Sequence, residues 1–304
     1  METIEQAIYR VLYREPEKYD EFLQLYAKLK RQGGIRSQLF PLLREAIYAE
    51  HIQATEFLWG EILAHNLTVK EEKETLLTAA YMGNTWIIRQ LVNRGMDISH
   101  FFIPIQDSPL RRAAEKCQLE TVMYLLDIGN YSESDLTDAL CSACEAPEMN
   151  FVSVEKVAPV VKVLLEAGAD PYGGSKSPIW NNMIDTGYDD DEESALLLLE
   201  YAHDESYFPY IYQLAICMPR LLEALIARGV RGDDITIENE EAMTLLMLAI
   251  FDEEIEAVRI LLKHGVNLEA RDANGKTALD YALHTKRQDI IELLQNYSTT
   301  QAMF

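Results

Sequence analysis

The stretch Thr244-Leu245-Leu246-Met247-Leu248-Ala249 returns in outline as Thr277-Ala278-Leu279-Asp280-Tyr281-Ala282, 33 residues further along the chain. Between the two copies run an apolar segment, Ala257 to Leu262, a glycine at Gly265, and Asn274-Gly275 just before the pattern restarts. A fixed period in this range is typical of a solenoid, in which each repeat is one small structural unit stacked on the next. The period therefore predicts that function lies on an extended surface.

The repeated pattern resembles the ankyrin repeat, which runs Thr-Pro-Leu-His-x-Ala-Ala-x-x-Gly-His and then Val-Val-x-Leu-Leu-Leu-x-x-Gly-Ala-Asp. Further copies can be read at 76–97, 108–129 and 136–170, degenerate ones at 177–203 and 208–229, and a weak one near Leu39. The resemblance covers roughly 39–296 and is clearest over 74–296, outside the degenerate copies at 177–229. It implies an all-α, ankyrin-like helical-repeat solenoid with an N-terminal helical cap.

Each position of the pattern has a physical reason. Proline suits the first helical turn, as at Pro109 and Pro178, because its missing N–H has no partner there anyway. Paired alanines let two helices approach closely, and the Leu, Val and Ile run gives the second helix a buried face. A glycine just past that helix ends it in a left-handed conformation at little cost. This conformation is predicted for Gly95, Gly129, Gly168, Gly229 and Gly265.

Two divisions of the chain are predicted. Residues 1–36 form a helical hairpin, ending at Gly33-Gly34, that covers the open end of the stack; the alternative is that this hairpin mediates dimerisation. Residues 37–300 form an array of about seven repeats, of which two are degenerate and one carries an insertion near 145–158. Such an insertion closes at modest entropic cost, so it is either functional or simply tolerated.

Composition argues against several classes of protein. The chain has 304 residues and is 48% apolar, but no apolar run approaches the length needed to span a bilayer. The acidic N-terminus does not read as a signal peptide, and only four cysteines are present, which fits reduced thiols in a cytoplasmic protein. No cofactor, metal or catalytic motif is recognised, and Cys141 with Cys144 lacks a second pair at zinc spacing. An enzyme is therefore not expected.

The charge is strongly negative and uneven. Formal net charge is −23, with net −8 over residues 1–152 and net −15 over residues 153–304. Between Asp185 and Glu256, 19 acidic residues face only three arginines. Such a field repels nucleic acid and anionic membranes and attracts a basic protein. The alternative is that these charges serve only solubility, because charge runs are usually solvated faces.

Aromatic residues flank the acidic run. Trp180 and Tyr188 precede it, and Tyr201, Tyr207, Phe208, Tyr210 and Tyr212 follow it. Aromatic anchors amid charge are typical of interface hot spots, although aromatics at these spacings also serve as core residues. A second unusual segment places Phe101 and Phe102 where polar loop residues are expected, either as core or as a contact.

The resemblance implies that a partner binds the concave side, formed by the first helix of each repeat and the loop before it. Transferred position by position, it gives contact residues after the paired alanines and in the preceding loops, to which the acidic and aromatic segments are added. The predicted partner-binding residues are Tyr81, Met82, Phe101, Phe102, Glu115, Lys116, Tyr172, Trp180, Tyr188, Asp189, Asp190, Asp191, Glu240, Glu241, Phe251 and Asp252.

The function predicted from these features is non-catalytic protein binding through an acidic surface. Its concrete form is an immunity or antitoxin-type antagonist that captures and inhibits a basic protein. No nucleic acid, membrane or cofactor is expected to take part, and the free protein is expected to be a monomer. The alternative is an adaptor, or a secreted bacterial effector that recruits a host protein through the concave face. Binding of a basic partner should weaken as ionic strength rises.

Overall fold

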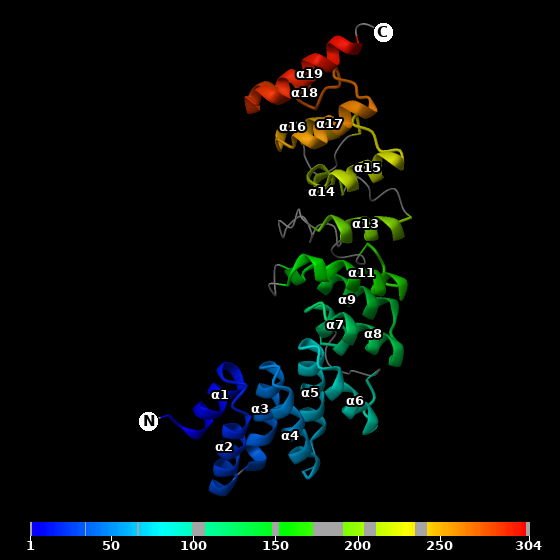
Figure 1. The fold of residues 1–304 in the computed structure, drawn as a ribbon. Coiled ribbons are helices and arrows are strands. Elements are labelled where there is room, and N and C mark those ends of the chain that lie inside the picture. Colours follow the sequence, from blue (N-terminus) through cyan, green and yellow to red (C-terminus); the bar gives the residue numbers. More distant parts are fainter. Residues whose placement is uncertain are drawn as a thin grey trace. The chain divides into compact units, whose positions relative to one another are not determined.

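The computed structural model describes residues 2–33, 35–65, 67–98, 107–147, 152–172, 191–203, 211–234 and 242–301, and within these ranges it contains helices and no β-strand (Figure 1). The chain forms two compact units, an N-terminal unit, Met1–Ala143, and a C-terminal unit, Cys144–Phe304. The predicted all-α repeat fold is confirmed. None of the helices in the described ranges is both long and apolar enough to cross a membrane.

The N-terminal unit is a series of helical hairpins. Its first hairpin is formed by the two helices predicted from 1–36, which end at Gly33; the proposed capping role of this hairpin stays a prediction. The helices are α1 (Ile4–Arg14), α2 (Tyr19–Gln32), α3 (Ile35–Tyr48), α4 (Ile52–Leu63), α5 (Val69–Tyr81), α6 (Thr85–Asn93), α7 (Pro109–Ala114), α8 (Leu119–Ile128) and α9 (Glu133–Cys144), the last of which reaches the boundary of the unit.

The C-terminal unit continues the hairpin pattern with one short 3₁₀ helix near its start, η1 (Val154–Lys156). Its α-helices are α11 (Val157–Glu166), α13 (Glu192–Tyr201), α14 (Tyr212–Cys217), α15 (Pro219–Ala227), α16 (Leu245–Phe251), α17 (Ile255–His264), α18 (Ala278–Thr285) and α19 (Gln288–Gln301). The predicted insertion near 145–158 lies between α9 and α11, and residues 148–151 of it fall outside the described ranges.

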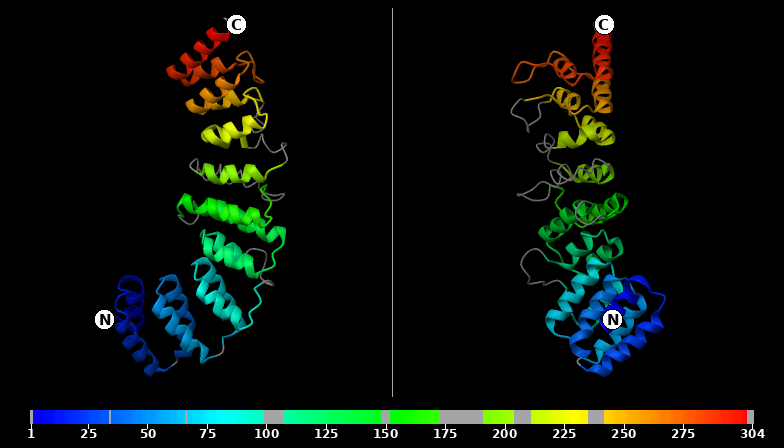
Figure 2. Two further views of the ribbon diagram at one scale, coloured as in Figure 1. Left: turned by 45° about the vertical axis from the view of Figure 1, so that its right-hand side comes forward. Right: turned by 90° about the vertical axis from the view of Figure 1, so that its left-hand side faces the viewer.

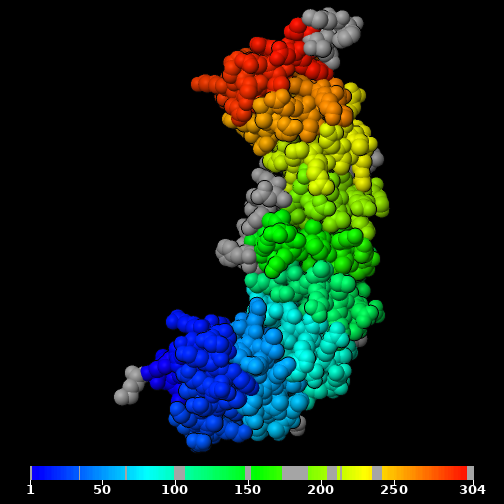
Figure 3. Space-filling model, in the orientation of Figure 1, coloured from blue at the N-terminus to red at the C-terminus, as the bar shows by residue number. Residues whose placement is uncertain are grey.

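Helices of successive hairpins pack against one another in chain order within each unit. In the N-terminal unit α1, α3, α5 and α7 form one row, and α2 contacts α4 while α6 contacts α8. In the C-terminal unit α14, α16 and α18 form one row, and α11, α13, α15, α17 and α19 form the other. Within each unit the colours therefore follow one another in both views of Figure 2 and as bands on the surface in Figure 3. We call α3, α5, α7, α14, α16 and α18 the inner helices. The second helix of each of these hairpins (α4, α6, α8, α15, α17 and α19) is its outer helix.

Small and branched apolar residues build the core between these rows. On α5, Leu76 and the paired alanines Ala79 and Ala80 are fully buried, and on α6 the same holds for Ile87 and Leu91. The alanines allow the close approach that the pattern predicts, and the branched residues fill the space between neighbouring hairpins. Because one hairpin leaves an apolar side uncovered, each repeat depends on its neighbours.

Hydroxyl side chains begin four of the inner helices, α5, α7, α16 and α18. Thr68, Thr244 and Thr277 each accept a hydrogen bond from the backbone three residues on, and Ser108 does the same for α7 ahead of Pro109. These bonds satisfy backbone N–H groups that have no partner within the helix. At Thr277 the box is completed by Asp280, whose carboxylate accepts from the Thr277 N–H at 2.8 Å. The Thr of the repeat pattern is thus a helix start.

Glycines end the second helix of most hairpins. Gly95, Gly168, Gly229 and Gly265 have φ of 88°, 101°, 102° and 86°, as predicted. The prediction is wrong for Gly129, which caps α8 at φ −99° in an extended conformation. A side chain at Gly129 would collide with the ring of Tyr131, so this glycine is required for close packing rather than for its backbone freedom.

The turn between the two helices of a hairpin also has a left-handed residue, and here it is seldom glycine. Five turns carry it, at Glu50 (φ 52°), Gly83 (75°), Cys117 (50°), Glu253 (63°) and Lys286 (59°). At the first four of these turns the N–H of the next residue donates to a carbonyl of the inner helix, as His51 does to that of Ala46 at 3.0 Å and Asn84 to that of Ala79 at 2.8 Å. This turn position therefore marks the same point in each of these hairpins.

Candidate interaction surface

The predicted contact residues of the N-terminal unit lie at the ends of inner helices. Tyr81 is the last residue of α5 and Met82 caps it, while Glu115 and Lys116 follow α7; all four are half-buried. The Lys116 ammonium lies over the Tyr81 ring, 5.2 Å from its centroid, and Glu115 pairs with Arg112 at 3.0 Å. These residues belong to one connected surface, but its charge is mixed rather than acidic.

Tyr81 lines a depression across three inner helices, α3, α5 and α7, which we call the inner groove. Its volume is about 490 Å³, and it is lined by Arg44, Tyr48, Glu74, Leu77, Thr78, Tyr81 and Arg112. The two arginines offset the single glutamate, so the inner groove does not attract a cation. The predicted acidic character therefore does not extend to this part of the inner-helix surface.

Three exposed tyrosines of the N-terminal unit were not among the contacts predicted from the sequence. Tyr9 and Tyr13 on α1 and Tyr48 on α3 are 37%, 49% and 40% exposed. The hydroxyl of Tyr13 donates to Glu45 at 2.7 Å, and partial burial together with that carboxylate raises its pKa. Tyr9 and Tyr13 are four residues apart on one helix, so an outward-facing aromatic pair could have been read from the sequence.

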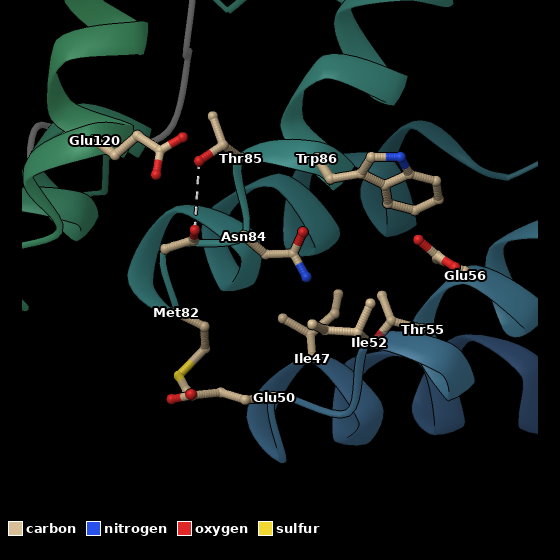
Figure 4. A pocket seen from close by; sticks show the side chains of 11 residues that line it. Ile47, Glu50, Ile52, Thr55, Glu56, Met82, Asn84, Thr85, Trp86 and Glu120 are labelled. Carbon is tan, nitrogen blue, oxygen red and sulfur yellow. Dashed lines mark hydrogen bonds between the residues drawn. The ribbon is translucent and has the colours of Figure 1, made fainter. Parts of the chain in front are cut away.

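A second depression opens where successive hairpins turn from their inner to their outer helices, and we call it the turn groove. It has a volume of about 400 Å³ and is lined by Ile47, Glu50, Ile52, Thr55, Glu56, Met82, Gly83, Asn84, Thr85, Trp86 and Glu120. Figure 4 shows Trp86 and Glu56 on one side and Met82 with Glu50 on the other. Of these residues, only Met82 is among the partner-binding residues predicted from the sequence.

In the C-terminal unit the predicted residues Phe251 and Asp252 end the inner helix α16, and we call this pair the α16 surface. The Phe251 side chain is 51% exposed, and its ring packs edge-on against Tyr281 with centroids 6.2 Å apart. Partial burial raises the pKa of the neighbouring Asp252 carboxyl. Among the described residues, Asp252 has no ion-pair partner.

Asp191 does not face a partner in this structure, and its predicted contact role is corrected. Its side chain is 3% exposed and accepts a hydrogen bond from the Ser194 N–H at 3.2 Å, which caps α13. Burial raises the pKa of this carboxyl. The acidic run thus includes a helix start, because a carboxylate at this position satisfies backbone N–H groups.

Much of the acidity of the C-terminal unit is used within the fold. Glu223 pairs with Lys263 at 3.4 Å and with His264 at 3.0 Å, and Glu253 pairs with Arg287 at 2.9 Å. Asp233 accepts from the Asn267 N–H at 2.7 Å. These contacts join neighbouring hairpins. The unit still carries 29 Asp and Glu against 12 Lys and Arg, net −17, compared with 21 against 15, net −6, for the N-terminal unit.

The remaining predicted residues are placed only in part. Tyr172 is half-buried, and its N–H donates to Asp170 at 3.0 Å in a tight turn. None of the four cysteines forms a disulfide bond, and the described ranges contain no group of acidic, His and Cys side chains arranged to hold a metal ion. Eight predicted contacts lie outside the described residues: Phe101, Phe102, Trp180, Tyr188, Asp189, Asp190, Glu240 and Glu241.

Comparison with known proteins agrees with this geometry. The family described as ankyrin repeats, in three copies, matches residues 214–302. The crystal structure of the human ASB11 ankyrin repeat domain covers 73% of this chain and 96% of that domain, with a TM-score of 0.51 at 21% identity, a likeness that shows the fold alone. The chain is an ankyrin-repeat protein.

Sequence similarity to two relatives covers part of the chain. The Arabidopsis thaliana protein LHCP TRANSLOCATION DEFECT is 30% identical over 140 residues, which are 43% of this ankyrin-repeat chain and 72% of that protein. Alpha-latrotoxin-Lh1a of Latrodectus hasselti is 34% identical over 74 residues, 24% of this chain. The chain spans only 6% of that toxin's length. Ankyrin repeats are generally non-catalytic scaffolds, and the chain is accordingly a protein–protein interaction module.

Proposed function

We propose that this ankyrin-repeat protein captures a basic protein and inhibits it by covering its working surface, in the manner of an immunity or antitoxin protein. The observation that carries the proposal is the α16 surface. There an exposed aromatic ring, Phe251, lies beside Asp252, an exposed carboxylate that has no cation among the described residues. A carboxylate without an intramolecular ion pair can pair with a cation that a partner presents, and it becomes desolvated only when the partner covers it.

The overall charge supports the same partner. A net charge of −23, with the larger share in the C-terminal unit, draws a basic protein toward the chain and speeds its association. Phe251 would act as the apolar anchor and Asp252 as the charged contact next to it, which is the usual composition of an interface centre. Binding at this charge-rich face would exclude an acidic substrate such as nucleic acid from the partner, because both would compete for the same cations.

The test uses the full-length chain as bait in cell lysate at about 50 mM and about 500 mM NaCl, where charge screening differs strongly. Captured proteins are identified by mass spectrometry, and the most enriched one is purified and assayed with and without the chain. We expect a basic protein that is retained at low salt, released at high salt and less active when the chain is added. F251A and D252N should each weaken binding by about tenfold.

Two matched variants act as controls. L283A removes another exposed apolar side chain of the C-terminal unit, 56% exposed on α18, and E200Q removes an exposed carboxylate on α13. Both should bind as the unchanged chain does. Capture of only neutral or acidic proteins at every salt concentration would refute the proposal. A basic partner that keeps its full activity would instead support the adaptor alternative.

A further inference from the structure

The turn groove is a candidate binding site that is separate from the α16 surface and lies wholly within the N-terminal unit. Its walls come from two successive turns, since Glu50, Ile52 and Glu56 belong to the α3–α4 hairpin and Met82 to Trp86 belong to the α5–α6 hairpin. Glu120 at the start of α8 closes one end. This groove runs along the edge formed by the turns rather than across the inner helices.

Two large apolar side chains are left open to solvent at this site. Ile52 is 70% exposed on the first turn of α4, and Trp86 is 38% exposed on the first turn of α6. They occupy nearby positions of successive hairpins, so their apolar surfaces lie on the same edge of the stack (Figure 4). Covering both at once would remove apolar area from water that the fold itself leaves uncovered.

Charge at the groove has one sign. The three ionisable residues that line it are Glu50, Glu56 and Glu120, and no lysine or arginine is among the lining residues. None of the three carboxylates forms an ion pair or a side-chain hydrogen bond with another described residue. In this the turn groove contrasts with the inner groove, where Arg44 and Arg112 accompany the single Glu74. A cation entering the turn groove would meet three carboxylates and no competing positive charge.

One of the lining residues carries a buried hydroxyl. Thr55 on α4 lines the turn groove, is 2% exposed, and its Oγ1 has no hydrogen-bond partner. Buried polar atoms are nearly always paired, because leaving one unpaired costs free energy. Other residues of the groove are already engaged: Asn84 accepts from the Ile87 N–H at 3.1 Å, and the Thr85 hydroxyl lies 3.3 Å from that of Thr121. Thr55 Oγ1 has almost no accessible area of its own, so an occupant meets the apolar and acidic side chains of the groove rather than this hydroxyl.

We propose that the turn groove is a docking site for a protein segment that presents an arginine or lysine next to a large aliphatic or aromatic side chain. The apolar side chain packs on Ile52 and Trp86, and the cationic one is attracted by the combined negative charge of Glu50, Glu56 and Glu120. The site does not depend on the function proposed for the α16 surface, because it uses other residues in the other unit.

The probe is a phage-displayed library of random twelve-residue peptides, selected on the full-length chain in low salt. The best peptide is then synthesised and its affinity measured by isothermal titration calorimetry. We expect enriched sequences that place Arg or Lys within two positions of Leu, Ile, Phe or Trp. Affinity should fall by about tenfold or more in I52S and in E56K, and it should also fall as NaCl rises from about 50 mM to about 500 mM.

Each variant has a matched control in the same unit. L63S changes an aliphatic residue that is 48% exposed at the end of α4, and E133Q removes an exposed carboxylate of α9; neither lines the groove. Both should leave the affinity unchanged, and thermal melts should show that all four variants fold. F251A should also bind the peptide normally, which separates this site from the α16 surface.

The remaining outcomes would each overturn the proposal. A library that yields no enriched peptide, or one enriched in acidic or purely apolar sequences, contradicts the predicted chemistry. Selected peptides that bind I52S and E56K as well as the unchanged chain occupy some other surface. Dimerisation that depends on Ile52 and Glu56, measured by light scattering, would show that a second copy of this chain is the occupant instead.

Discussion

At the scale of single residues, the left-handed turn positions combine local strain with the same place in each hairpin that shows them. Glu50, Cys117, Glu253 and Lys286 hold φ between 50° and 63°, where a side chain crowds its own backbone, and glycine fills this position only at Gly83. The turn is kept because its backbone bonds close the hairpin. The strain is therefore removable without changing the fold.

Replacing Lys286 with glycine should stabilise the protein. Lys286 is exposed at φ 59°, so K286G relieves the strain, partly offset by the greater freedom of glycine in the unfolded chain, for a net gain of about 0.5–1 kcal/mol. Urea denaturation followed by circular dichroism measures it. K286A removes the same side chain but keeps the strain and should show no gain; an equal gain in K286A would attribute the effect to the side chain instead.

Some of the residues in a left-handed conformation could be predicted from the sequence, and others could not. Gly95, Gly168, Gly229 and Gly265 were predicted because glycine itself signals the conformation. Glu253 and Lys286 carry no such signal, because their conformation is imposed by the helices on both sides. Asp191 was assigned to a contact surface, although an acidic residue just before the apolar run of α13 equally predicts a helix cap, and the structure shows that use.

At the scale of the helices, polar residues at helix starts join neighbouring hairpins. Glu71 in the first turn of α5 accepts from the Thr68 N–H at 2.8 Å and from both terminal nitrogens of Arg36 on α3, at 3.1 and 2.9 Å. One carboxylate thus completes a capping box and links two inner helices. The Arg36 guanidinium is the main cause that lowers the pKa of Glu71 from 4.5 to about 2.

The Glu71 contact should make stability depend on pH in the acid range. Because its folded-state pKa lies below its usual value, ionised Glu71 stabilises the fold above about pH 5, and this contribution is lost as pH falls toward about 2. The shift corresponds to at most about 3 kcal/mol, and solvent screening at this partly exposed pair reduces the expected loss to about 1 kcal/mol.

The measurement compares urea unfolding of the unchanged chain and E71Q at pH 7 and pH 3. The stability difference between them should be about 1 kcal/mol at pH 7 and should shrink at pH 3, where the unchanged chain has lost part of the same contribution. E133Q alters an exposed carboxylate and should show no such convergence. A difference that stays constant with pH would mean that Glu71 acts through packing alone.

The helices and the α16 surface were largely predictable, and the turn groove was not. Alanine pairs, apolar runs and threonine starts located α5, α7, α16 and α18, and the repeat alignment placed Phe251 at an exposed helix end. The turn groove could not be predicted because its residues belong to hairpins 33 or 34 residues apart in the sequence. One of these hairpins lies in the weak first copy of the repeat pattern. Apolar Ile52 and Trp86 in the first turns of outer helices were the available signal.

At the scale of the whole molecule, the charge acts on folding and on binding in opposite directions. With 50 acidic and 27 basic residues, we expect repulsion within the folded chain to exceed the attraction of its ion pairs. Added salt screens that repulsion and so favours the folded state, while it weakens the attraction to a basic partner. The same property therefore has two separable consequences.

Salt should raise the melting temperature of the isolated chain. Between about 20 mM and about 300 mM NaCl the screening length falls from roughly 20 Å to roughly 6 Å, and we expect Tm to rise by several degrees as repulsion within the chain is reduced. Differential scanning calorimetry at pH 7 measures this shift. Near pH 4.6, where the net charge vanishes, the same change in salt should have little effect. A fall in Tm at pH 7 would show that ion pairs such as Arg287 with Glu253 dominate.

The recurring left-handed turn has one more consequence, for how such a chain can be lengthened or shortened. Glu50 and Gly83 occupy corresponding points of adjacent hairpins, and so do Glu253 and Lys286, each pair 33 residues apart. A deletion or duplication that begins and ends at this turn preserves the alternation of inner and outer helices along the chain. Insertion or deletion of whole repeats at these points can therefore change the number of repeats. The turn that closes each remaining hairpin stays the same.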